Sequence, residues 1–96
     1  MNPIPHNDET VALAKRLVWF EPPQEALADP VRFLAYAFAR ATHDDMNLLR
    51  RYLSETDLRE ALSKAPPGII DARSWSYWLV RLGLNPASPM PARKFG

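Results

Sequence analysis

The residues whose types could do chemistry include one histidine that stands beside two acids. His43 is followed by Asp44 and Asp45, and imidazole next to carboxylate is a combination used in metal binding and in acid–base catalysis. Adjacent residues of a helix point in different directions, however, and no second ligand follows His43 at metal-site spacing. Thr42 followed by acids is typical of a capped helix start. We therefore predict no metal site, no cofactor and no catalytic residue.

A second group interleaves arginine with aromatic residues in the segment DARSWSYWLVRLG, residues 71–83. Such a mixture can stack on nucleic-acid bases or can fill a hydrophobic core. At about 100° per residue, Trp75 and Trp78 fall on one side of a helix, which predicts that both are buried. Arg73, Tyr77 and Arg81 line up on the opposite side. They could form a solvated surface with contacts within the helix. They could instead form a contact surface for a partner, because arginine and tyrosine are enriched at interface hot spots.

The third group is Arg50-Arg51, in a chain with nine arginines and three lysines. Arginine suits bidentate pairing with carboxylate or phosphate. Residues 49–96 carry eight Lys/Arg against four Asp/Glu, which could attract an acidic surface. The pI of about 8.1 is nevertheless lower than that of most dedicated DNA-binding domains, at about 9 or more. The candidate partner-binding residues are Arg50, Arg51, Arg73, Tyr77 and Arg81.

Helices are the elements that must position these residues. Prolines and capping residues predict helices over about 8–20 and 24–28, and helices that start after Asp29, Thr42, Ser54 and Asp71. Gly83 is placed to end the last helix. The helix after Asp29 is apolar over most of its circumference, which predicts a central position.

These signals predict an all-α fold: a compact orthogonal bundle of about five short helices with a Pro-rich C-terminal tail. We expect a flexible lead at 1–6, a single helical domain at 7–84 and the tail at 85–96. Phe95 in that tail could lie along a partner as part of an extended arm. The predicted core consists of Leu17, Val18, Val31, Leu34, Phe38, Leu49, Leu53, Leu58, Leu62, Trp75, Trp78, Leu79 and Leu82.

Six short motifs in the segment from Leu17 to Leu84 carry a resemblance. They read W-F-x-P, D-P-x-R-F-L, a short acidic turn, D-L-R-E-A-L, A-P-P-G-I and R-S-W-x-Y-W. The segment resembles small bacterial proteins of unknown function that are associated with genes for nucleotidyltransferase toxins of the abortive-infection type. The resemblance implies an antitoxin-like or accessory partner of such a toxin, and it carries over no catalytic residue.

The sequence therefore predicts a non-enzymatic protein-interaction module whose partner is another protein or a second copy of this chain. The alternative is a small nucleic-acid-binding helical domain that represses its own operon. The absence of cysteine, of a long apolar run and of a secretion signal predicts a cytoplasmic protein with no membrane span.

Overall fold

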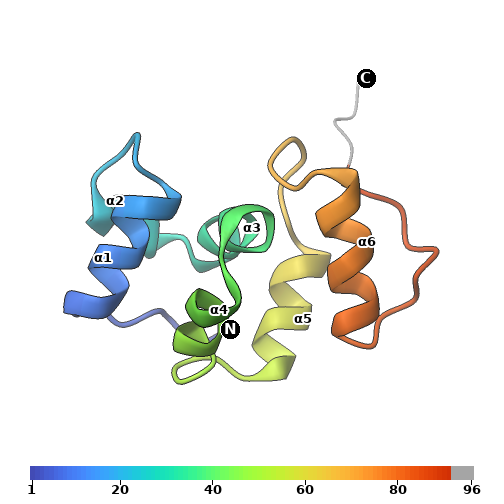
Figure 1. The fold of residues 1–96 in the computed structure, drawn as a ribbon, viewed down its shortest axis with the longest axis horizontal. Helices are drawn as coiled ribbons and strands as arrows, with labels where there is room; N and C mark the ends of the chain where they lie inside the picture. The colour runs from blue at the N-terminus through green and yellow to red at the C-terminus, as the bar shows by residue number, and fades with distance from the viewer. Residues whose placement is uncertain (92–96) are drawn as a thin grey trace.

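Six α-helices make up the regular structure of residues 1–91, the part of the chain that the computed structural model describes (Figure 1). The all-α class is confirmed: all six predicted helical segments are present, and the short one expected at 24–28 is complete enough to count as a helix beside the about five of the predicted bundle. The helices are α1 (Asp8–Leu17), α2 (Pro23–Ala28), α3 (Pro30–Arg40), α4 (His43–Leu49), α5 (Glu55–Ser63) and α6 (Ala72–Arg81).

The helix starts follow the capping residues. Asp29, Thr42, Ser54 and Asp71 each accept a hydrogen bond from the backbone amide three residues on, which satisfies a donor that a helix leaves free at its first turn. At the other end of α6, Gly83 has φ +72°. The amides of Gly83 and Leu84 donate to the carbonyls of Val80 and Leu79, as in a Schellman motif. The predicted caps and the predicted terminator of α6 are confirmed.

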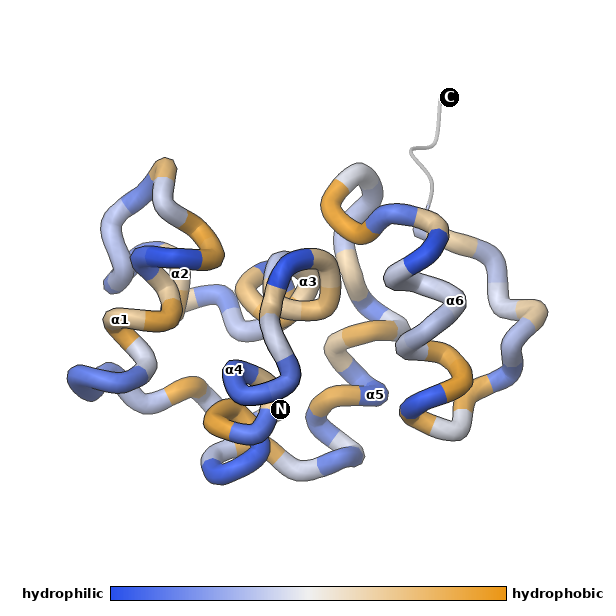
Figure 2. Tube along the Cα trace, in the orientation of Figure 1, coloured by the Kyte–Doolittle hydropathy of each residue, from blue (hydrophilic) through white to orange (hydrophobic). Residues whose placement is uncertain are grey.

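The central helix is α3, as its nearly continuous apolar surface predicted. It packs against α1, α2, α5 and α6. In Figure 1 it is seen nearly end-on, whereas α5 and α6 are seen from the side. Figure 2 draws α3 mostly in apolar colours, whereas α1, α4 and α5 alternate between apolar and polar. Neighbours on several sides bury two faces of α3. Phe33 is therefore as fully buried as Leu34.

Two predictions about the N-terminal half need correction. Helix α1 ends at Leu17 rather than near Phe20, and Arg40 of α3 donates to the Leu17 carbonyl at 2.9 Å, which satisfies an acceptor that the helix end leaves free. Val31 was predicted to be a core residue but is only half-buried, since it lies in the first turn of α3. All the other predicted core residues are buried.

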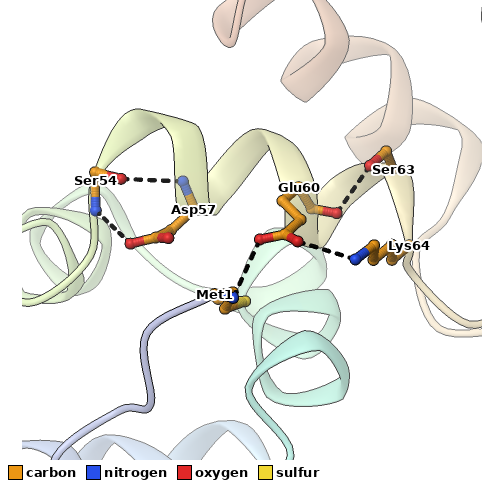
Figure 3. A network of polar contacts seen from close by, with 6 residues as sticks. All are labelled: Met1, Ser54, Asp57, Glu60, Ser63 and Lys64. Carbon is orange, nitrogen blue, oxygen red and sulfur yellow. Dashed lines mark hydrogen bonds and ion pairs between the residues drawn. The ribbon is translucent and has the colours of Figure 1, made fainter.

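The segment at residues 1–6, predicted to be a flexible lead, has no helix but packs on the domain. Ile4 is only 2% exposed and belongs to the core, and the Pro5 carbonyl accepts a 2.6 Å hydrogen bond from Thr10 Oγ1. The Met1 ammonium group lies 3.5 Å from the Glu60 carboxylate on α5, and Figure 3 shows this ion pair. Residues 1–6 thereby join α1 to α5.

Figure 3 also shows how the N-terminus of α5 is capped. Ser54 and Asp57 exchange hydrogen bonds of 3.0 and 3.1 Å in a capping box (Figure 3). The amide of Ser54 lowers the pKa of the Asp57 carboxyl, because a hydrogen bond to the carboxylate favours its charged form. The predicted box is confirmed, with aspartate in the position usually held by glutamate or glutamine.

The first part of the predicted tail runs beside α6. The Ser88 carbonyl accepts a 3.0 Å hydrogen bond from Trp75 Nε1, so Ser88 is held at α6 while the segment around it forms a loop beside the helix (Figure 1). The predicted role of Phe95 as part of an extended arm falls on residues 92–96, outside the described residues.

Candidate interaction cleft

A cleft of about 460 Å³ lies between α4 and α6, over the C-terminal end of α3. Its floor consists of the buried side chains of Phe38, Met46 and Trp78. The Trp78 indole donates to the Phe38 carbonyl at 3.0 Å, and the two rings lie 5.1 Å apart. This hydrogen bond and ring contact link α6 to α3, so the apolar floor is held in place.

The wall formed by α6 carries Arg73, Tyr77 and Arg81 at intervals of four residues. Tyr77 is 56% exposed, and its ring meets Trp78 edge-on at 5.1 Å. The predicted division of this helix is therefore confirmed for burial: Trp75 and Trp78 are 6% and 8% exposed, whereas the opposite face is open. The three predicted partner-binding residues of α6 lie along one side of the cleft.

The facing wall comes from α4 and contributes His43, Asn47 and Arg50. Arg50 lies within 2.7 Å of Glu55. His43 and Asn47 were not among the predicted partner-binding residues. Their spacing at i, i+4 and i+7 places all three on one face of α4, but only the tertiary contact shows which helix that face opposes.

Positive charge dominates the cleft. Its lining contains Arg50, Arg73 and Arg81 but no aspartate or glutamate. Within residues 1–91, Arg73 and Arg81 form no ion pair. Two arginines beside an apolar floor can hold carboxylate or phosphate groups and can stack on an aromatic ring.

Arg51, the fifth predicted residue, lies outside the cleft lining. It follows the last turn of α4 and pairs with Glu9 of α1 at 3.1 Å, with its guanidinium 5.8 Å from the Tyr52 ring centroid. Adjacent residues at a helix end diverge in direction, so Arg50 and Arg51 do not act on one surface. The structure brings four of the five predicted residues together and excludes Arg51.

Of the two acids beside His43, Asp45 has a structural role. Asp45 accepts hydrogen bonds from Arg16 at 2.5 and 3.2 Å and from the Thr42 amide at 3.1 Å. The hydrogen bond from Arg16 is the largest cause of the lowered pKa of the Asp45 carboxyl, and the Thr42 amide adds to it. Within residues 1–91, no three of the His, Asp and Glu side chains form a group that could hold a metal ion.

A second exposed aromatic group lies at the turn between α1 and α2. Trp19 is 74% exposed and meets Phe20 edge-on at 5.6 Å, and Phe20 in turn contacts Tyr36 at 5.5 Å. The guanidinium groups of Arg32 and Arg40 lie over the Tyr36 ring. The sequence placed Trp19 and Phe20 in the last turn of a longer predicted helix, and neither was predicted to belong to a site.

Comparison of the chain with models of protein families, with curated proteins and with solved structures gives no match. The expected association with nucleotidyltransferase toxins therefore stays a prediction. None of the helices in the described range has the length and apolar character needed to cross a membrane.

Proposed function

We propose that this protein is a non-enzymatic, cytoplasmic interaction module that holds a segment of a partner protein in the cleft between α4 and α6. The observation that supports this most directly is the lining itself. Arg73 and Arg81, which form no ion pair within residues 1–91, and the exposed Tyr77 stand over an apolar floor, and the cleft lining has no carboxylate. Buried anchors surrounded by Arg and Tyr are the usual composition of a binding hot spot.

The resemblance of residues 17–84 supplies the proposed partner, a nucleotidyltransferase toxin of the abortive-infection type. Binding through Arg50, Arg73, Tyr77 and Arg81 would place the helical domain on the toxin and occlude it. Such a mechanism needs no catalytic group on this chain.

The test is to express the tagged protein in the organism that encodes it and to identify the proteins that co-purify with it. Two charge-reversed variants are treated in the same way. Arg73→Glu changes the cleft, and an acid in the first turn of α6 is compatible with the helix dipole. Lys15→Glu makes the same change on the exposed side of α1, away from the cleft. We expect the parent and Lys15→Glu to enrich a nucleotidyltransferase, and Arg73→Glu to lose most of it.

Two results would contradict the proposal in different ways. Equal capture by Arg73→Glu would remove the cleft from the mechanism. Cleft-dependent capture of some other protein would leave the module in place and exclude the toxin as its partner.

A further inference from the structure

The α4–α6 cleft has two properties that together restrict what can occupy it. The first is its apolar floor of Phe38, Met46 and Trp78. A cavity of about 150 Å³ is enough to hold a benzene molecule, so a cleft of about 460 Å³ has room for a large side chain with flanking backbone. Methionine in the floor adapts to the shape of the inserted group.

The second property is the placement of charge on α6. Arg73 and Arg81 are eight residues apart, which corresponds to about 12 Å along the helix axis, and Tyr77 lies midway between them. Neither arginine has an ion pair within residues 1–91. Negative groups about 12 Å apart on an occupant would therefore meet one arginine each.

An extended peptide matches this spacing. Residues i and i+4 of an extended chain are about 13 Å apart, and residues i, i+2 and i+4 point to the same side. An acid, an apolar side chain and a second acid at alternate positions would thus face Arg73, the cleft floor and Arg81.

We infer that the cleft binds an acidic segment of a partner protein in which two carboxylates flank one large apolar side chain at alternate positions. This inference rests on the proposed function and adds the chemistry of the bound segment. Charge complementarity favours a carboxylate-bearing protein, because Arg73 and Arg81 of the lining form no ion pair within residues 1–91 and the lining has no acid.

Nucleic acid is less well matched to the same surface. Arg50 is engaged by Glu55 and Arg51 by Glu9, so the basic cluster of the sequence is largely neutralised within the fold. Two remaining arginines would contact few phosphates, whereas nucleic-acid binding draws its affinity from many phosphate contacts.

The test uses fluorescein-labelled peptides and fluorescence anisotropy with the full chain. The probe GSDSWSDSG carries the inferred pattern. Matched probes replace both acids (GSNSWSNSG), the tryptophan (GSDSASDSG) or the acid spacing (GSDDSWSSG), and a short single-stranded oligodeoxythymidylate represents nucleic acid. We expect the first probe to bind at least about ten-fold more tightly than each of the others, because each peptide control loses the charge-assisted contacts, the apolar anchor or the spacing between them.

Protein variants assign the binding to the cleft. Arg73→Glu should weaken the GSDSWSDSG complex about ten-fold or more, whereas Lys15→Glu should leave it unchanged. Absence of binding, equal binding by Arg73→Glu, equal binding of the respaced probe, or preference for the oligonucleotide would each overturn the inference.

The outcome is separable from that of the proposed function. Cleft-dependent partner capture without binding of the acidic probe would reject the inferred segment and retain the module. Binding of the probe without any cleft-dependent partner would confirm the chemistry of the cleft and reject the module.

Discussion

At the residue scale, the two tryptophans of α6 are buried and their polar atoms are satisfied. Trp75 Nε1 donates to the Ser88 carbonyl and Trp78 Nε1 to the Phe38 carbonyl, both at 3.0 Å. A buried indole usually needs such a partner. Helical spacing predicted the burial of both rings. It could not predict either acceptor, because Phe38 is 40 residues from Trp78 in the sequence and Ser88 lies 13 residues from Trp75, beyond the end of the helix.

Truncation of Trp78 should be far more costly than truncation of its neighbour. We expect Trp78→Ala to lower the free energy of unfolding by ~3–5 kcal/mol, because it opens a cavity under α6. Tyr77→Ala removes a largely exposed ring from the same helix and should cost less than about 1 kcal/mol. Urea denaturation followed by circular dichroism measures both, and similar losses in the two variants would contradict this division of α6.

At the element scale, a polar contact between Arg16 and Asp45 joins α1 to α4. The Asp45 carboxylate closes its own helix through Thr42 and also receives two hydrogen bonds from Arg16. The sequence predicted Asp45 in the first turn of a helix. The partner Arg16 could not be predicted, since 29 residues separate the two.

This contact should make the free energy of unfolding depend on pH in the acidic range. The folded-state pKa of Asp45 is lowered, so its contribution is complete above the unfolded-state pKa of about 4 and is lost as the pH falls through the folded-state pKa. Between pH 5 and pH 3, Asp45→Asn should therefore lose less stability than the parent. At pH 7 it should be less stable by about 1–2 kcal/mol.

The control is Asp44→Asn, which changes an exposed acid in the same turn with no ion pair in residues 1–91. It should follow the parent in urea denaturation at each pH. Some acid dependence will persist in Asp45→Asn, because the pKa values of Asp57, Glu60 and Asp71 are also lowered. If the free energy of unfolding of Asp45→Asn fell with decreasing pH as steeply as that of the parent, the Arg16–Asp45 contact would be excluded as a source of the pH dependence.

At the scale of the whole molecule, the sequence was informative where signals are local. Caps, breakers and apolar spacing predicted the helix starts, the central position of α3 and most of the core. The hydrogen bond at the end of α1 comes from Arg40, and the full burial of Phe33 comes from the helices packed around α3. Local sequence patterns do not predict such contacts between distant parts of the chain. The cleft was predictable only in part. The helical spacing of Arg73, Tyr77 and Arg81 follows from the sequence, whereas the packing of α4 opposite them is known only from the structure.

The lead at residues 1–6 shows the same limit and allows a direct test. Two prolines and the absence of periodicity predicted a flexible segment, yet Ile4 enters the core and the Met1 ammonium group approaches α5. A single apolar residue without periodic neighbours gives no sequence signal, although its burial contributes as much as that of a helix residue. We therefore expect Ile4→Ala to lower the free energy of unfolding by about 2–4 kcal/mol.

Ile69→Ala is the matched control, because Ile69 also lies in a loop but is only half-buried. Its loss of stability in urea denaturation should be clearly smaller. If instead Ile4→Ala were as stable as the parent, the lead would lie outside the cooperative unit and the domain would begin near Asn7, as the sequence predicted. A large loss would mean that residues 1–6 help to fix α1 against α5, and that the folded unit begins before its first helix.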